Sequence, residues 1–134
     1  MAKNKKKTDK GQSRWKREQV PVGKVFVSAS FNNTLVTVTD EKGGALNWGS
    51  AGRSGFKGTR KATPYAATSA VESVIRRAKE DFGLKNVDVY LKGPGPGRDA
   101  ALRAIKSVGL RMNLIADVTP MPHNGPRARK KRRV

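Results

Sequence analysis

Apolar and polar residues alternate near the start of the chain, and this period of two predicts β-strands. In residues 20–30 (VPVGKVFVSAS), every second side chain from Val25 to Ala29 is apolar. The β-branched run 35–39 (LVTVT) follows and predicts a second strand. Between them lies the pair Asn32 and Asn33, and asparagine tolerates a positive φ, so we expect a tight hairpin. A shorter strand at 45–50 (ALNWGS) completes an antiparallel meander.

A period near 3.6 appears after residue 62 and predicts a helix. Thr63 can cap the free N–H groups, Pro64 suits the first helical position, and Gly83 suits the C-terminal cap. The apolar stripe of this helix consists of Ala67, Val71, Val74, Ile75, Ala78 and Phe82.

The remaining pattern predicts a strand, a second helix and a last strand. The strand covers 87–91, and the helix covers 99–108 with Ala101, Ala104, Ile105 and Val108 on its buried face. Asp99 lies at the positive end of this helix, and Gly109 ends it. The last strand covers 111–119 and stops at Pro120.

The predicted order β-β-β-α-β-α-β belongs to the α/β class. Each helix joins two strands as a right-handed crossover, so the last two strands add parallel to the meander and give a mixed five-stranded sheet. This order resembles the ribonuclease H architecture. We expect a basic N-terminal extension at 1–20, one core domain at 21–121 and a basic C-terminal tail at 122–134.

Charge adds a strong constraint on function. The 134 residues hold 29 Lys and Arg against 10 Asp and Glu, a net charge of +19. Residues 1–19 and residues 122–134 carry a net +6 each. Such segments have little to bury, so we expect both to be disordered in isolation, and their like charges repel one another unless a polyanion neutralises them. Nucleic acid is the favoured polyanion; solvated tails, a nuclear-import signal and a membrane surface are the alternatives.

The residue inventory argues against catalysis, metals and cofactors. The chain has no cysteine, and His123 is its single histidine. A ribonuclease-H-type nuclease needs clustered acids to hold two metal ions, but the first strand contains none, and Asp88 and Glu72 cannot form the cluster alone. We interpret Asp40, Asp99 and Asp117 as a turn, a cap and a strand end. We therefore expect no enzyme, cofactor or metal, no membrane span and no partner copy of this chain.

The glycine-rich segment 51–62 (AGRSGFKGTRKA) is predicted to be a loop that binds RNA. Its glycines allow phosphates to approach the backbone, and it leads into a helix N-terminus at Thr63. Phe56 offers a ring for base stacking. The alternative is a solvated loop with Phe56 in the core. The polar candidates are Arg53, Ser54, Lys57, Thr59, Arg60 and Lys61.

Two further turns are candidates for phosphate contact. Residues 92–98 (KGPGPGR) join a strand to a helix, with Lys92 and Arg98 beside Gly95 and Gly97. The Lys-Ser/Thr pair of a nucleotide-hydrolysing P-loop is missing, and a tight structural connection is the alternative. The amides of Asn32 and Asn33 can bond ribose or phosphate, or can serve only the hairpin.

The C-terminal tail combines cations with an Asn-Gly pair. The candidates for RNA contact are His123, Asn124, Arg127, Arg129, Lys130, Lys131, Arg132 and Arg133. Asn124 precedes Gly125, which does not shield the preceding side chain, so cyclisation and conversion to isoaspartate are predicted. An ordinary turn is the alternative.

Several separated motifs resemble the small-subunit ribosomal protein S-eleven family from Gly23 to Val134. They are SFNNTLVTVTD (30–40), SAGRSGFKGTRKATPYAA (50–67), KGPGPGRDAALRA (92–104), DVTPMPHNG (117–125) and KKRRV (130–134). The resemblance implies a ribonuclease-H-like fold without nuclease activity. It also implies rRNA contacts by Asn32-Asn33, by Arg53 through Thr63, by Lys92 through Arg98 and by the tail from His123.

The same resemblance implies a set of partners and a location. The partners are 16S rRNA on the platform of the 30S subunit and the sixth, seventh and eighteenth small-subunit proteins, close to the mRNA exit path. The implied location is the cytoplasmic ribosome, with an organellar ribosome as the alternative. A general nucleic-acid chaperone is the alternative function, and it would bind DNA and RNA without distinction.

Overall fold

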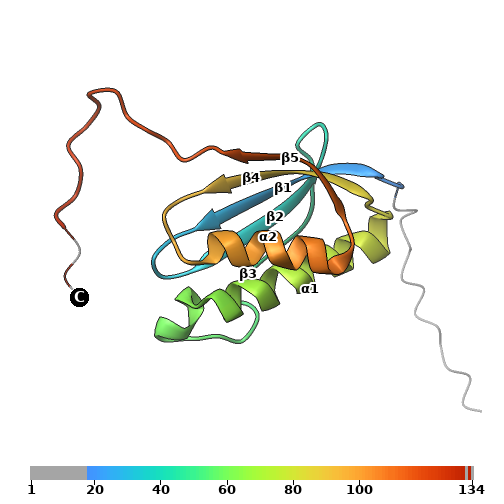
Figure 1. Cartoon of the computed structure of the whole chain (residues 1–134), viewed down its shortest axis with the longest axis horizontal. Coiled ribbons are helices and arrows are strands. Elements are labelled where there is room, and N and C mark those ends of the chain that lie inside the picture. The colour runs from blue at the N-terminus through green and yellow to red at the C-terminus, as the bar shows by residue number, and fades with distance from the viewer. Residues whose placement is uncertain (1–17, 132, 134) are drawn as a thin grey trace, which may run out of the picture.

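Five strands form one mixed sheet in the computed structural model, which describes residues 18–131 and 133 (Figure 1). The spatial order is β3-β2-β1-β4-β5. The pairs β1–β2 and β2–β3 are antiparallel, whereas β1–β4 and β4–β5 are parallel. This arrangement confirms the predicted mixed α/β fold. The strands are β1 (Val22–Ala29), β2 (Thr34–Asp40), β3 (Ala45–Ser50), β4 (Asn86–Lys92) and β5 (Arg111–Asp117).

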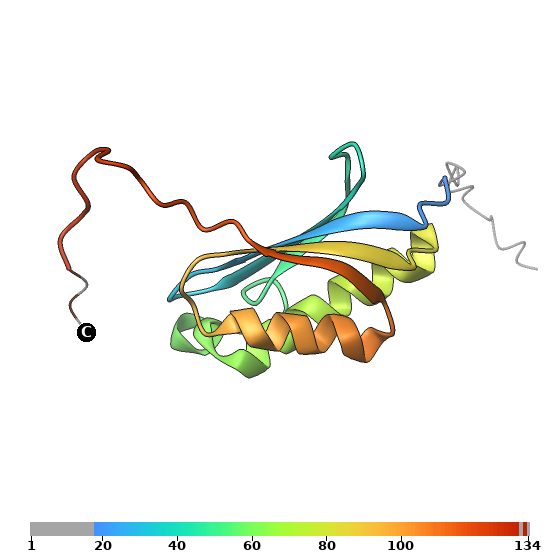
Figure 2. The same cartoon turned by 45° about the horizontal axis from the view of Figure 1, so that its top comes forward.

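Two α-helices lie on the same face of the sheet, as the two views in Figures 1 and 2 show. Helix α1 (Pro64–Phe82) contacts β2 and β3, and helix α2 (Gly97–Val108) contacts β1 and packs against α1. A short 3₁₀ helix, η1 (Gly58–Ala62), precedes α1. The opposite face of the sheet has no helix on it in the described part of the chain.

The ends of the helices follow the residues that the sequence places there. The Thr63 hydroxyl accepts a hydrogen bond from the amide of Ala66 at 3.3 Å, and Pro64 occupies the first helical position. Gly83 and Gly109 take the left-handed conformation, with φ of 65° and 91°, and end α1 and α2.

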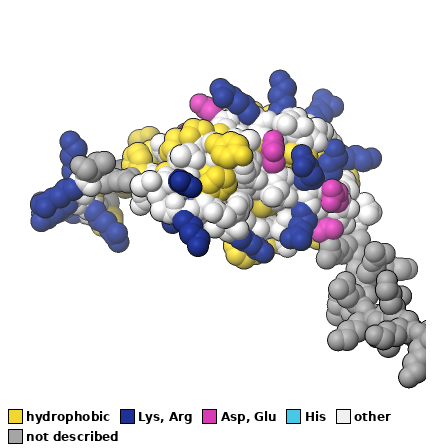
Figure 3. All heavy atoms as spheres, turned by 90° about the horizontal axis from the view of Figure 1, so that it is seen from below, with side chains coloured by type: hydrophobic (Ala, Val, Ile, Leu, Met, Phe, Trp, Pro, Cys, Tyr) yellow, Lys and Arg dark blue, Asp and Glu magenta, His cyan; other side chains and the backbone are white. Residues whose placement is uncertain are grey.

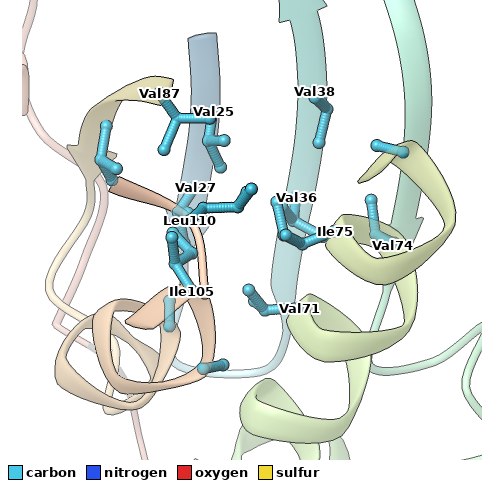
Figure 4. Close-up of a cluster of buried hydrophobic side chains, with 14 of the residues drawn as sticks. Val25, Val27, Val36, Val38, Val71, Val74, Ile75, Val87, Ile105 and Leu110 are labelled. Atoms are coloured by element: carbon cyan, nitrogen blue, oxygen red, sulfur yellow. The ribbon is translucent and has the colours of Figure 1, made fainter. Parts of the chain in front are cut away.

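The hydrophobic core fills the space between the sheet and the two helices (Figure 4). Alternate residues of β1 and β2 are buried, and the predicted stripe of α1 faces them, except that Phe82 is only half-buried. The buried side chains labelled in Figure 4 are Val25, Val27, Val36, Val38, Val71, Val74, Ile75, Val87, Ile105 and Leu110. Sequence periodicity therefore identified the core of this fold correctly.

Large side chains stand on the open face of the sheet. Phe26 is 40% exposed, and its ring stacks on that of Tyr90 in the neighbouring strand, with centroids 5.2 Å apart. Phe26 is paired with Thr37, and Thr37 is paired with Trp48, so these side chains share one row across the sheet.

Three local predictions need correction. The hairpin between β1 and β2 forms without a positive φ at Asn32 or Asn33, because the hydroxyl of Ser30 bonds both the amide and the carbonyl of Asn33 and closes the turn. Segment 51–62 is not wholly irregular, since its last residues form η1.

The third correction concerns the start of α2. The helix begins at Gly97 rather than Asp99, and its N-cap is Pro96. Asp99 lies in the first turn and makes no capping hydrogen bond, so its favourable contribution is limited to the helix dipole.

Replacing Ile75 by alanine should destabilise the fold strongly. Ile75 is fully buried in the core, so the Ile75→Ala variant should lose about 2–5 kcal/mol of unfolding free energy, measured by urea denaturation. Glu80 is exposed on the same helix, and Glu80→Ala should change that free energy by less than about 0.5 kcal/mol. Equal losses for the two variants would contradict the assignment of the core.

Candidate nucleic-acid interface

Three of the predicted RNA-binding segments meet at one end of the sheet. Thr34 lies at their centre: its carbonyl accepts a hydrogen bond from Ala51, at the start of the 51–62 segment, at 3.1 Å. Gly97 of the segment 92–98 packs directly against the Thr34 side chain, since a Cβ at Gly97 would overlap with the Thr34 hydroxyl. Gly95 donates its amide to the carbonyl of Ala29, beside the asparagine turn, at 2.8 Å. These contacts bring together residues that are distant in the sequence.

The tail leaves the molecule from the same end (Figure 1). Strands β1, β4 and β5 run parallel, so their carboxyl ends lie side by side, and the segments that follow them emerge together. In open α/β sheets, ligands bind outside the carboxyl ends of the strands. The convergence of the four predicted segments therefore agrees with where such a sheet places a binding site.

The segment 51–62 is a series of turns anchored to the end of β3. The Ser50 hydroxyl accepts a hydrogen bond from the amide of Arg53 at 3.1 Å, and the Ser54 hydroxyl donates to the Ser50 carbonyl at 3.1 Å. Gly55 and Gly58 have φ of 97° and 60°, conformations that side chains rarely adopt. The backbone of this loop is thus fixed by its own hydrogen bonds and its glycines.

The polar candidates of this loop are presented to solvent. Arg53, Lys57 and Arg60 are exposed, and Lys61 is half-buried. Ser54, Thr59 and Thr63 are also exposed, although the Thr63 hydroxyl is engaged in the helix cap. No acidic residue lies between Ala51 and Thr63, so this part of the described chain has an uninterrupted positive character.

Phe56 is not enclosed in the core, and its stacking on a base stays a prediction. Its ring is half-buried and packs edge-on against Tyr65, with centroids 5.8 Å apart and planes at 83°. Tyr65 lies in the first turn of α1 and is 72% exposed. The pair therefore forms an aromatic ridge between the loop and the helix. The sequence analysis missed Tyr65 because it assigned that position only to the helix.

Trp48 is a second aromatic residue that the sequence analysis did not single out. It is 58% exposed in the edge strand β3, and the Arg53 guanidinium lies 4.3 Å from its ring centroid. Arg53 also donates to the Trp48 carbonyl at 3.5 Å, while the Trp48 amide donates to the side-chain oxygen of Asn47 at 2.9 Å. Alternation along β3 could have identified Trp48 as a surface residue, since it places this side chain on the face of the sheet that is turned away from the core.

The glycines of segment 92–98 allow close packing. A Cβ at Gly93 or Gly95 would overlap with the backbone of Ala29 or Ser30, and one at Gly97 would lie 3.0 Å from the Cβ of Ala67. Gly95 and Gly97 are buried, which favours the structural interpretation of these two residues. Lys92, Pro94 and Pro96 are exposed. The RNA contacts predicted for Gly95 and Gly97 stay predictions.

Arg98 has partners within the chain. Its guanidinium donates to the Gly93 carbonyl at 2.9 Å and to the Asp117 carboxylate at 2.7 Å. Thr119 completes this network, because its hydroxyl donates to Asp117 at 2.6 Å and accepts from the Gly93 amide at 3.1 Å. The hydrogen bonds from Thr119 and then from Arg98 hold the pKa of Asp117 well below its ordinary value. Arg98 thus fastens the loop to the end of β5.

The tail lies away from the core, and every described residue from Val118 onward is exposed. His123, Arg127, Arg129, Lys130, Lys131 and Arg133 are presented without cover. Asn124 is exposed and has a φ of 60°, the only positive φ of a described non-glycine residue. Its conversion to isoaspartate stays a prediction. Arg132 and residues 1–17 lie outside the described residues.

Cations are spread over the face that Figure 3 shows, with a few acidic side chains between them. Among the described residues, no group of three or more His, Cys, Asp or Glu side chains could hold a metal ion, and no helix is long and apolar enough to cross a membrane.

The family model and the individual relatives that match this chain all point to one protein family. The model of the family described as ribosomal protein S11 matches residues 23–133. A protein from Halorhodospira halophila is 56% identical over 124 residues, covering 92% of this chain and 93% of its own length. Proteins from Shewanella amazonensis and Lawsonia intracellularis are 56% and 52% identical over 118 residues, covering 88% of this chain and 90% and 91% of theirs. All three are named small ribosomal subunit protein uS11.

Removing the Thr119 hydroxyl should raise the pKa of Asp117. In the Thr119→Val variant the carboxylate no longer has its strongest donor, so the pKa should move up towards its ordinary value of 3.8, as followed by carbon-13 NMR of the side-chain carboxyl. Because the folded-state pKa is the lower one, the network stabilises the fold above about pH 4, and that effect disappears as the pH falls through the folded pKa. An unchanged titration in the variant would contradict this network.

Proposed function

This chain belongs to the ribosomal protein S11 family, and from that premise we propose that it binds small-subunit rRNA at the end of the sheet where its basic segments converge. As a member of this family it is a structural, non-enzymatic component of the small ribosomal subunit. Its relatives are bacterial, which indicates a location on the cytoplasmic ribosome. The family match over residues 23–133 is the single observation that carries the conclusion.

Charge supports rRNA as the ligand. Packing of RNA segments brings phosphates together, and cationic side chains placed between them reduce their repulsion. The exposed cations of segment 51–62 suit this role, since nothing acidic in that segment competes with phosphate for them. The exposed tail extends the same role away from the core. Folded RNA hides its major groove, so recognition is expected to use shape, phosphates and ribose hydroxyls.

The two glycine-rich segments contribute differently in this proposal. Segment 51–62 presents charge directly, with the Phe56–Tyr65 ridge beside it for contact with an unstacked base. In segment 92–98, Lys92 is exposed and available, whereas Arg98 holds the loop closed through Asp117. Arg98 is therefore proposed to act on RNA binding mainly by positioning the loop.

The finer placement of the protein follows from the family resemblance. We propose 16S rRNA on the platform of the 30S subunit as the binding site, near the mRNA exit path. The sixth, seventh and eighteenth small-subunit proteins are the proposed neighbours. A nucleic-acid chaperone remains the competing function, and equal affinity for duplex DNA and for the cognate rRNA would favour it.

Deleting residues 127–134 should impair assembly more than folding. The full chain should cosediment with 30S particles reconstituted in its absence, and the truncated chain should be released at lower salt because it lacks six cations. Its thermal unfolding midpoint should stay close to that of the full chain, since the described residues removed are exposed. Failure of the full chain to enter the particles at any salt would end the proposed function.

Replacing Arg53, Lys57, Arg60 and Lys61 by alanine should weaken rRNA binding without unfolding the protein. The logarithm of the binding constant should also depend less on the logarithm of salt, by about 0.7–0.9 for each phosphate that the variant no longer neutralises. The measurement is filter binding to a 16S rRNA fragment at several salt concentrations.

A matched control removes four cations from elsewhere on the molecule. Lys85, Arg103, Lys106 and Arg111 are exposed, and Lys85, Lys106 and Arg111 lie towards the opposite end of the sheet and helices. Their joint replacement by alanine lowers the net charge equally but should reduce affinity less. Equal losses of affinity for the two variants would show that net charge alone governs binding and would move the site away from segment 51–62.

A further inference from the structure

A polar cavity of about 410 Å³ lies between the edge strand β3 and helix α1. We propose that this cavity binds a phosphodiester group of RNA, an inference that rests on the proposed function and adds a contact to it. The groups that would hold the phosphate are Arg53, Ser69, Ser73 and Arg77. Ser69, Ser73 and Arg77 belong to none of the segments from which the sequence predicted RNA binding.

Helix α1 supplies one wall of the cavity through a stripe of polar residues. Ser69, Ser73 and Arg77 are spaced four residues apart, so their side chains lie one above another on the same helix face. The two serine hydroxyls and the Arg77 guanidinium have no hydrogen bond or ion pair with any described residue. Their donors are therefore available to a ligand.

Strand β3 supplies the opposite wall, and the side chain of Arg53, which follows this strand, lies against Trp48. The Arg53 guanidinium is held 4.3 Å from the centroid of the Trp48 ring and bonds the Trp48 carbonyl at 3.5 Å. An arginine stacked on an aromatic ring keeps its planar donors in a defined orientation and loses less conformational freedom on binding. Arg53 is thus positioned before any ligand arrives.

The two walls are held together closely. The Asn47 side chain donates to the Val74 carbonyl at 3.0 Å, which ties β3 directly to the backbone of α1. A Cβ at Gly49 would overlap with the side chain of Val74, so glycine is required for this close approach. These contacts fix the spacing between strand β3 and helix α1, and with it the width of the cavity.

The charge of the cavity selects an anion. None of the described residues that line it is acidic, and two of them are arginines. Asp81 lies one turn beyond Arg77 and borders the neighbouring cavity, so Arg77 stands at the boundary between the two. Guanidinium groups and hydroxyls are suited to phosphate oxygens, whereas Val74 and the Trp48 ring alone provide too little apolar surface for a hydrophobic ligand.

Two adjacent arginines allow a matched test. Arg76 and Arg77 are both exposed on α1, but Arg77 lines this cavity whereas Arg76 faces α2 beside Ser107. We expect Arg77→Gln to weaken binding of a 16S rRNA fragment roughly tenfold, as for the loss of one charge-assisted hydrogen-bonding group. The salt dependence should fall by about one phosphate contact. Arg76→Gln removes the same charge and should change the affinity less than about twofold.

The outcomes separate this inference from the function on which it rests. Equal effects of Arg76→Gln and Arg77→Gln, with normal binding by the unmodified chain, would overturn the proposed phosphate-binding role of the cavity. The proposed function would then still stand. Absence of rRNA binding by the unmodified chain would overturn both. Urea denaturation of the two variants verifies that each is folded under the binding conditions.

Trp48 provides a second, local readout. The chain has two tryptophans, and Trp15→Phe leaves Trp48 as the only one. Titration of this variant with the same rRNA fragment should change the Trp48 emission, and adding Arg77→Gln should shift the midpoint to about tenfold higher RNA concentration. Emission that stays constant while the RNA binds would place the RNA elsewhere and overturn the inference.

Discussion

The close approach of chain segments at the carboxyl ends of β1 and β4 is the constraint on which the candidate interface depends. Gly95 packs against the carbonyl of Ser30, and Gly97 packs against Thr34 and Ala67, with no room for a side chain at either position. Without this close packing the asparagine turn, segment 51–62 and segment 92–98 would not share one end of the sheet. The glycines of this region are therefore architectural first, and the surface they create is the one proposed to bind RNA.

The sequence predicted the elements well because their signals are local. Alternation in β1 and β2, the stripe on α1 and the glycine caps each depend on neighbours within one or two turns. The sequence analysis missed contacts between residues that periodicity does not bring together. Arg98 meets Asp117 nineteen residues later, and Phe56 meets Tyr65 across the start of a helix. The predicted hairpin at the asparagine pair forms, but without the expected positive φ, because the Ser30 hydroxyl closes the turn.

The cations of this protein fall into two physical classes. Arg53 and Arg98 are held by contacts within the chain, so their positions exist before RNA binds. The described cations of the tail and of segment 51–62 beyond Arg53 have no such contacts, so fixing their positions on a ligand would cost conformational entropy. Charge composition alone does not distinguish these two classes of cation. The sequence analysis therefore assigned the same RNA-binding role to Arg98 and to Arg127. The fold therefore separates cations held in one position from cations that are exposed on the loop and the tail.

Strand β3 lies at the edge of the sheet, so its outer backbone groups have no neighbouring strand of this sheet to pair with. An edge strand exposes amide and carbonyl groups that can pair with a strand of another molecule and begin aggregation. At Trp48 both groups are already occupied, the amide by the side chain of Asn47 and the carbonyl by Arg53. The same arginine that stacks on the indole thereby occupies the Trp48 carbonyl, so the backbone of Trp48 offers less to a strand of another molecule.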